Sequence, residues 1–241
     1  MPRKSRRNQG SERLAALVAA ATRVFCRCGY GRTQMADVAR EMGVSTGAVY
    51  QYVEGKEALF DLVVRANAGG ERDVLLNVPL PVKTPPAGAT LEFLRSALNR
   101  PHQWPKLEEA LAVTQAVDAR QELEAILREQ YRLMREYRYG LVLLTRSALE
   151  FPGLLEVFVL GLRQLLMKQL AQYLESRCRA GQMAPQADWH AVAGMLVQTM
   201  AWANHQRPFD PGLSHFTEEV MEATVITILT RGLLEPTRLI S

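Results

Sequence analysis

Residues 25–60 of this 241-residue chain read FCRCGYGRTQMADVAREMGVSTGAVYQYVEGKEALF, and this stretch decides the fold. Two short segments with the apolar spacing of helices are separated there by Gly43-Val44-Ser45. Glycine suits the left-handed backbone that ends a helix, and serine is a good cap for the start of the next one. Two short helices joined by such a turn, with a third packed behind them, are typical of a helix-turn-helix.

The sequence on either side of this turn supplies the other helices of the unit. Apolar residues recur at spacings of three and four, which predicts one amphipathic stripe per helix. Gly29 and Gly31 end the first of these helices, and the Thr33 hydroxyl is suited to cap the second. The predicted helices cover residues 12–28, 33–42, 46–53 and 56–67.

The helix predicted over residues 46–53 has an unusual outer face. Two valines point toward the core, whereas Gly47 and Gln51 lie opposite them between two tyrosines. A solvated face would normally carry Glu and Lys. Gln51 can pair with adenine in the major groove, and tyrosine hydroxyls can reach phosphates. We therefore expect this helix to read DNA; core packing of Tyr50 and Tyr52, and a Gln51 that merely faces solvent, are the alternatives.

The charge of the chain is concentrated at its N-terminal end. Residues 1–60 hold ten Lys/Arg and five Asp/Glu, a net +5, whereas the whole chain carries +4. A basic module joined to a near-neutral remainder suggests contact with a polyanion. We expect residues 1–10 to form a basic flexible arm, and Lys56 adds a cation at the start of the fourth helix.

The same stretch resembles the DNA-binding signature of the TetR family of transcriptional regulators. The resemblance covers about residues 14–64 and departs mildly at Val53, where an aromatic residue often stands. It rests on Phe25, Gly29, Thr33, Val38, Ala39, Gly43, Val44, Ser45, Gly47, Tyr50, Lys56, Glu57 and Leu59. It implies a DNA-binding domain over residues 11–67 and a larger helical domain over 68–241, which binds an effector and dimerises.

The resemblance also implies a set of DNA contacts and a way of working. A homodimer would bind a double-stranded, palindromic or pseudo-palindromic DNA operator and act as a repressor. Binding of a small organic effector would release the protein from the operator. An activator, or a helix-turn-helix protein without an effector, is the alternative. The expected DNA contacts are Thr33, Gln34, Ser45, Thr46, Gly47, Ala48, Tyr50, Gln51, Tyr52 and Lys56.

The rest of the chain also predicts helices, so the fold class is all-α. No alternating Val/Ile/Thr-rich run bounded by hairpin turns occurs. Residues 80–88 contain three prolines and are expected to form a loop. Further helices are expected over residues 90–99, 106–117, 121–150, 154–180, 188–204 and 216–231.

The last two of these helices are the expected dimer interface. In the family they pair with those of a second subunit, although Met and small residues at helical spacing also suit an ordinary core. The stripe residues are Val192, Met195, Leu196, Thr199, Ala203, Met221, Val225, Ile228 and Leu229.

Aromatic residues with a few polar groups suit a pocket for a small organic ligand, although ordinary core packing is the alternative. Neither the identity nor the charge of the effector follows from the sequence. The candidate pocket residues are Trp104, Tyr131, Met134, Arg135, Phe158, Trp202 and His205.

Several functional classes are not expected. The four histidines lack metal-site spacing, and there is no phosphate loop or nucleophile elbow, so we expect no enzyme, metal or cofactor. Cys26, Cys28 and Cys178 form neither a disulfide framework nor a metal site, and a redox role for them stays open. The longest apolar run, about residues 154–162, is too short to span a membrane, which predicts a cytoplasmic protein.

Overall fold

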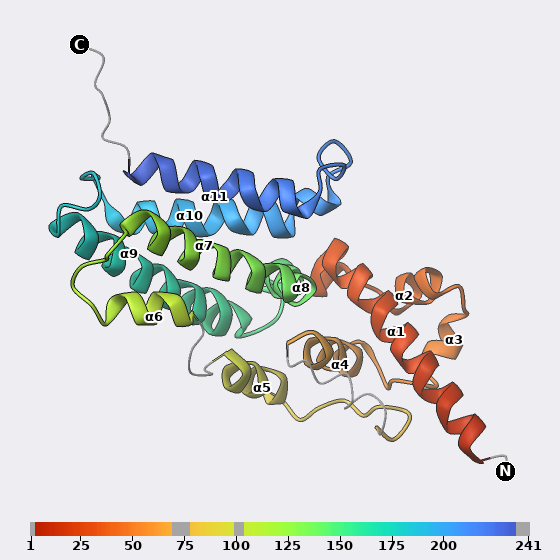
Figure 1. The fold of residues 1–241 in the computed structure, drawn as a ribbon. Coiled ribbons are helices and arrows are strands. Elements are labelled where there is room, and N and C mark those ends of the chain that lie inside the picture. Colours follow the sequence, from red (N-terminus) through yellow and green to blue (C-terminus); the bar gives the residue numbers. More distant parts are fainter. Residues whose placement is uncertain (1–2, 69–77, 99–103, 235–241) are drawn as a thin grey trace. The chain divides into compact units, whose positions relative to one another are not determined.

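The structure is a computed structural model that describes residues 3–68, 78–98 and 104–234 (Figure 1). Within these ranges every regular element is a helix, and the only β-type pairing is an isolated bridge between Val53 and Val82. The all-helical prediction is confirmed. The chain forms two compact units, one made of Met1–Asn99 with Tyr139–Leu160 and the other of Arg100–Arg138 with Gly161–Ser241.

The first unit contains the predicted helix-turn-helix together with two helices from further along the chain. Its helices are α1 (Arg3–Arg32), α2 (Met35–Met42), α3 (Thr46–Val49), α4 (Lys56–Ala68), α5 (Ala89–Leu98) and most of α8 (Arg138–Ser147). The sequence predicted a boundary between residues 67 and 68. In the structure the first unit extends beyond this boundary to Asn99 and also includes residues 139–160.

Helix α1 forms the centre of this unit. It begins at Arg3, so residues 3–10 are helical where the sequence predicted a flexible arm. Its apolar stripe is buried, with Leu14, Leu17, Ala21, Val24 and Phe25 all at most 1% exposed. The helix is kinked at Gly29, whose φ of 75° and ψ of 175° lie outside the helical region.

The turn between α2 and α3 has the predicted caps. Gly43 ends α2 with a φ of 73°, and the Ser45 hydroxyl accepts the Ala48 N–H at 3.3 Å. The start of α2 differs from the prediction. Its N-cap is Gln34, whose N–H donates to the Asp37 carboxylate at 3.0 Å, whereas the buried Thr33 hydroxyl donates to the Gly29 carbonyl at 2.7 Å.

The third helix is shorter than predicted. Regular α-helix ends at Val49, and residues 50–53 continue as hydrogen-bonded turns, with the Tyr52 N–H donating to the Val49 carbonyl at 3.0 Å. Hydrogen bonds between residues three apart tighten the last turn of a helix. The chain then leaves the helix at Val53, where the bridge to Val82 begins.

Residues after α8 complete the first unit. The Glu150 carboxylate accepts the Gly31 N–H at 2.8 Å, at the end of α1. The Phe151 ring lies 5.0 Å from the Tyr30 ring and 4.9 Å from the Phe60 ring, centroid to centroid. The helix-turn-helix is therefore packed against residues about 120 positions away in the sequence.

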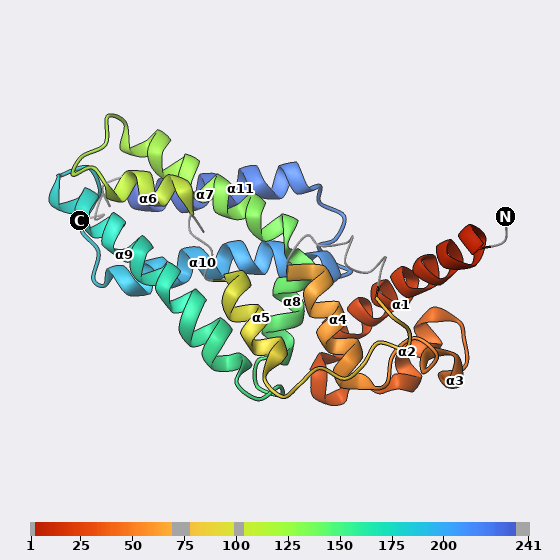
Figure 2. The same cartoon turned by 90° about the horizontal axis from the view of Figure 1, so that it is seen from below.

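The second unit is a layered helical bundle (Figure 2). Its longer helices pack against each other, α9 on α10, α7 on α11, and α7 on α10. The helix predicted over residues 121–150 is interrupted at Tyr137, which ends α7 with a φ of −94° and a ψ of 18°. The helices of this unit are α6 (Pro105–Leu111), α7 (Ala119–Glu136), α9 (Gln164–Arg179), α10 (Trp189–His205), the short η3 (Arg207–Phe209) and α11 (Glu218–Leu234). The π-helix η2 (Leu155–Arg163) precedes α9.

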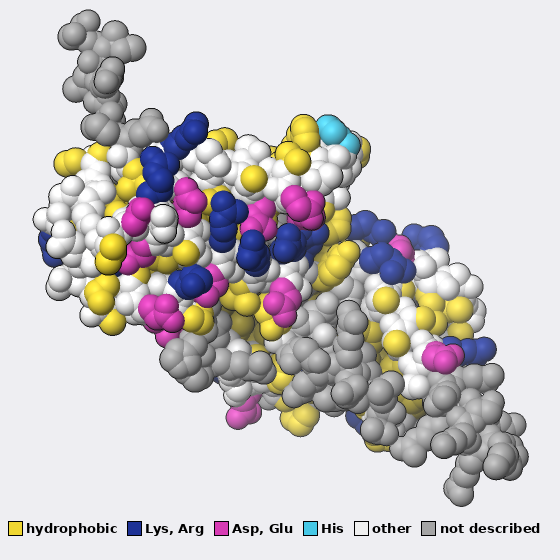
Figure 3. Space-filling model, viewed as in Figure 1, with side chains coloured by type: hydrophobic (Ala, Val, Ile, Leu, Met, Phe, Trp, Pro, Cys, Tyr) yellow, Lys and Arg dark blue, Asp and Glu magenta, His cyan; other side chains and the backbone are white. Residues whose placement is uncertain are grey.

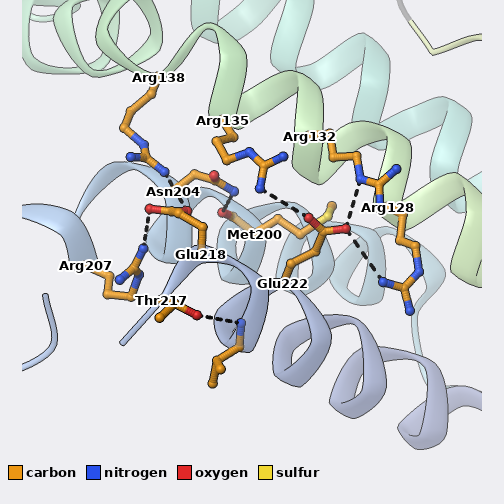
Figure 4. Close-up of polar contacts among 11 residues, drawn as sticks. Arg128, Arg132, Arg135, Arg138, Met200, Asn204, Arg207, Thr217, Glu218 and Glu222 are labelled. Carbon is orange, nitrogen blue, oxygen red and sulfur yellow. Dashed lines mark hydrogen bonds and ion pairs between the residues drawn. The ribbon is translucent and has the colours of Figure 1, made fainter. Parts of the chain in front are cut away.

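Two sets of ion pairs hold this bundle together. Arg177 of α9 is fully buried and donates to Glu122 at 2.7 Å and to the Ala110 carbonyl at 2.7 Å, which joins α9 to α7 and α6. Three arginines of α7, together with Arg138 at the start of α8, reach two glutamates of α11 (Figure 4). Glu222, which is almost fully buried, lies 3.0 Å from Arg132. In Figure 3 basic and acidic side chains lie together over α7, where it borders α11.

Candidate nucleic-acid interface

The outer face of α3 and the turn after it is the one that the sequence predicted. Gly47, Tyr50 and Gln51 are exposed, and 47% of Tyr50 is accessible. Val49 and Val53 are at most 1% exposed and anchor the opposite side in the core. An exposed glycine, glutamine and tyrosine on a rigidly held helical turn form a surface that can enter the major groove.

The neighbouring candidates border this face. Ser45 and Gln34 are exposed, and Thr46, Ala48 and Tyr52 are partly exposed. The exposure of Tyr50 does not fit the alternative that this ring packs in the core. Tyr52 is partly buried, which fits both packing and phosphate contact. Contact with DNA stays a prediction for all these residues.

Thr33 and Lys56 are engaged inside the unit. Thr33 is 1% exposed, and its hydroxyl donates a hydrogen bond to the Gly29 carbonyl. The Lys56 ammonium donates to the Tyr30 carbonyl at 3.0 Å and lies 4.5 Å from the centre of the Tyr30 ring. A cation at the C-terminal end of a helix satisfies free carbonyls and opposes the negative end of the dipole. In this structure both residues fix the end of α1, and their predicted DNA contact is untested.

Helices α1 and α2 are joined by a pair of charged contacts. Arg23 and Arg27 each place a guanidinium nitrogen 2.7 Å from a different oxygen of Glu41. These guanidinium groups lower the pKa of Glu41, which therefore stays ionised at neutral pH. The pairs help hold α2, and hence the turn into α3, against α1.

Sequence reasoning missed two contacts of this interface. Residues Val82–Thr84 run along the end of the α3 turn and hydrogen-bond to Tyr52 and Glu54. Glu150 holds the end of α1. The proline-rich composition predicted only a loop, and nothing in the local pattern indicates where such a loop docks.

The candidate effector residues are divided between the two units. Trp104, Tyr131 and Met134 are buried in the second unit, where the Trp104 indole donates to the Ile126 carbonyl at 2.9 Å. Arg135 is held by Glu222, and 38% of Trp202 is exposed. Phe158 is buried and belongs to the first unit.

A set of buried polar atoms in the second unit has no hydrogen-bond partner among the described residues. They include the side-chain amide oxygens of Gln130 and Asn204, the Tyr131 hydroxyl and the His205 Nε2. Burial and, to a smaller extent, the nearby Arg138 charge lower the pKa of His205 to about 4, so the imidazole is neutral at neutral pH. Native proteins rarely leave such groups unpaired, so they are candidates for contact with a bound molecule.

The predicted dimer stripe is also divided by the structure. Met195 and Ile228 are 67% and 64% exposed on the outer faces of α10 and α11. Leu196, Ala203 and Val225 are at most 4% exposed and belong to the core of the unit. An i, i+3, i+4 stripe is wide enough that its inner edge packs within the chain. The remaining members, Val192, Thr199, Met221 and Leu229, are intermediate.

Other features of the described residues are consistent with this arrangement. None of their helices is long and apolar enough to cross a membrane. Three or more metal-ligating side chains do not gather anywhere in the described part of the chain. Burial raises the pKa of the Cys26 thiol to about 12, so this thiol stays protonated and unreactive at neutral pH.

Comparisons with known proteins agree with the geometry. Residues 17–63 match the sequence model of the bacterial regulatory proteins of the tetR family, and this match spans α1 to α4. No curated protein matches the chain significantly by sequence. The ketosteroid transcriptional regulator KstR2 of Mycobacterium tuberculosis has a similar fold, with a TM-score of 0.57 and 14% identity over 92% of this chain and 95% of that one.

A second solved structure, AibR in complex with isovaleryl coenzyme A and operator DNA, also has a similar fold. The TM-score is 0.50 and the identity 14%, over 93% of this chain and 99% of AibR. At such identities the likeness concerns the fold, with an N-terminal helix-turn-helix and a C-terminal helical domain. The match at residues 17–63 shows that the helix-turn-helix region is similar to the tetR family of bacterial regulatory proteins, and the solved structures show that the rest of the chain shares their fold.

Proposed function

We propose that this regulator is a repressor that binds a palindromic or pseudo-palindromic operator as a homodimer and is released by a small-molecule effector. The exposed face of Gly47, Tyr50 and Gln51 carries the proposal, because it offers a small surface and hydrogen-bonding groups where a recognition helix meets base edges. The first unit would read DNA, and the second would bind the effector and the partner subunit.

Replacing Gln51 tests the assignment of the reading face. Operator fragments selected by the parent protein from random DNA define the preferred sequence. Gln51→Ala is expected to relax preference at one base pair of each half-site, with a loss of about 1–3 kcal/mol of discrimination, because one side chain reads that pair. Gln164→Ala, an exposed glutamine of the second unit, should retain the parent preference. Equal preferences for all three proteins would contradict the assignment.

The uncharged outer face of α10 and α11 supports the proposed homodimer. No Asp, Glu, Lys or Arg occurs from Trp189 to His205, and between Val220 and Thr230 the one charged residue is the buried Glu222. The surface over α11 in Figure 3 is correspondingly free of charge along most of its length. A helical face without charges is suited to a stable subunit interface. A second copy of the chain would cover Met195 and Ile228.

The effector is proposed to bind in the second unit against α7 and α10. The unpaired polar atoms of Tyr131, Asn204 and His205 would supply its hydrogen bonds. The AibR structure holds both a ligand and operator DNA, which supports the view that this fold accommodates both. An effector that prefers one arrangement of the two units would shift the protein toward or away from the DNA-bound state.

A single-atom change at Tyr131 tests the effector site. Compounds that dissociate the operator complex are identified first, by the fluorescence anisotropy of labelled operator. Tyr131→Phe is expected to raise the effector concentration needed for release about tenfold, because one buried hydrogen bond is lost. Operator affinity without effector should stay unchanged. Tyr137→Phe, at the partly exposed end of α7, is the control. Equal release of parent and Tyr131→Phe would exclude this hydroxyl from the site.

A further inference from the structure

A short segment after α4 returns to the end of the recognition turn. We call residues 80–84 the strap. The Val82 N–H donates to the Tyr52 carbonyl at 2.8 Å, and the Glu54 N–H donates to the Val82 carbonyl at 3.0 Å. These two bonds form the isolated bridge between Val53 and Val82. The strap therefore pairs with the backbone on both sides of Val53.

The Glu54 side chain adds two further contacts to this pairing. Its carboxylate accepts the Thr84 N–H at 2.8 Å and forms an ion pair with the Lys83 ammonium. Both partners lower the pKa of Glu54. The contacts are therefore complete at neutral pH and weaken as the pH falls through that lowered value.

The other end of this connection is also fixed. The Thr90 hydroxyl, in the first turn of α5, donates to the Asp61 carboxylate of α4 at 2.8 Å, and both side chains are buried. The same carboxylate binds Arg65 at 2.8 Å. Pro81 precedes the first anchor, and Pro85 and Pro86 lie between the two; these prolines restrict the backbone and reduce the entropy lost on docking.

The recognition turn needs such support. Its regular helix is only four residues long, and so short a helix has little stability of its own. Ser45 and the Gly43 turn hold its start. At its other end the strap binds Tyr52 and Glu54, directly after the exposed Tyr50 and Gln51.

We infer that the strap is part of the DNA-reading apparatus, in which Glu54 is a positioning residue that holds the end of the recognition turn so that Tyr50 and Gln51 meet the base edges. This inference rests on the proposed function. The DNA-reading element then extends to residue 84, beyond the helix-turn-helix itself. Lys83 acts through Glu54 and not by binding phosphate.

A charge swap in the full-length protein tests the inference. The variants are Glu54→Lys, Lys83→Glu and the double swap, and the measured quantity is the ratio of operator affinity to affinity for unrelated DNA. Each single variant is expected to lower this ratio about tenfold, and the double swap should restore it to within about twofold. Glu54→Lys is diagnostic because an added cation by itself strengthens binding to operator and unrelated DNA alike and leaves their ratio unchanged. A lower ratio would therefore report the lost positioning of the recognition turn.

Controls separate positioning from other effects. Glu175→Lys, which reverses one partner of an exposed ion pair with Arg179 in the second unit, should leave the ratio unchanged. A direct phosphate contact by Lys83 would instead make Lys83→Glu weaken both DNAs equally, reduce the salt dependence by about one charge, and resist rescue. That result, or single variants that bind like the parent, would overturn the inference.

A readout without DNA keeps the strap testable if the parent protein selects no operator, which would count against the proposed function alone. Hydrogen exchange of the Val82 and Glu54 amides is expected to be slow in the parent, because both N–H groups are bonded. In Glu54→Lys it should be at least tenfold faster, and in the double swap it should return toward the parent rate. Glu54→Gln serves if Glu54→Lys does not fold. Exchange that is fast in the parent would overturn the inference.

Discussion

The double variant Met195→Asp, Ile228→Asp is expected to behave as a monomer of about 27 kDa and to lose nearly all operator affinity. Both side chains are about two-thirds exposed in the single chain, so the substitutions should leave its fold intact. In a two-fold dimer each substitution is present in both subunits. Four carboxylates would therefore be buried without a partner, at a cost of several kcal/mol each. The dissociation constant of the dimer should therefore rise by at least about a thousandfold.

Light scattering at micromolar concentration measures this effect directly. The parent should have twice the mass of the chain, whereas the double variant should have the mass of one. Val117→Asp is the control, because this valine of the second unit is fully exposed and lies outside α10 and α11. A double variant that keeps the parent mass would show that the subunits meet elsewhere. A monomeric parent would refute the proposed homodimer.

Gly29→Ala is expected to lower the free energy of unfolding of the first unit by about 2–6 kcal/mol, the sum of two contributions. With a φ of 75° and a ψ of 175°, Gly29 has a backbone conformation that other residues rarely adopt, at a cost of about 1–3 kcal/mol. An added Cβ would also lie 2.5 Å from the Glu150 carboxylate and 2.9 Å from the Arg146 carbonyl. The backbone of α8 would have to move, which adds an overpacking cost of about 1–3 kcal/mol.

Two other glycines separate these contributions in urea unfolding followed by circular dichroism. Gly43 has a φ of 73° but open space around it, so Gly43→Ala should cost about 1 kcal/mol. Gly55 has neither a positive φ nor a close neighbour, and Gly55→Ala should change stability by less than about 0.5 kcal/mol. If Gly29→Ala were no worse than Gly43→Ala, the close packing of α8 on α1 would be refuted.

The structure also changes the meaning of several residues that the sequence singled out. Lys56 is among the expected DNA contacts, which stays a prediction, and in the structure its ammonium is bonded to two carbonyls at the end of α1. Thr33 was expected to cap α2, yet Gln34 does so, because the Thr33 hydroxyl donates to the Gly29 carbonyl instead. In both cases the position is important to the turn, and the local pattern could not identify the bonded partner.

The helix-turn-helix could be predicted from sequence because its determinants are local. A glycine at a positive φ, a serine that caps the next helix and apolar residues at spacings of three and four all act within one or two turns of backbone. The exposed face of Gly47 and Gln51 follows from the same periodicity. These features need no knowledge of the rest of the chain.

Only the tertiary structure decided what supports that element. Lys56 binds a carbonyl 26 positions away, Glu54 a strap amide 30 away, and Glu150 an amide 119 away. Such partners are selected by how the chain folds back on itself, and a glutamate that will bind a distant amide has the same local sequence signal as one that faces water. The sequence by itself determined that the chain has a helix-turn-helix with an exposed face suited to DNA, and the tertiary structure decided how that turn is held, because holding it depends on contacts between distant segments.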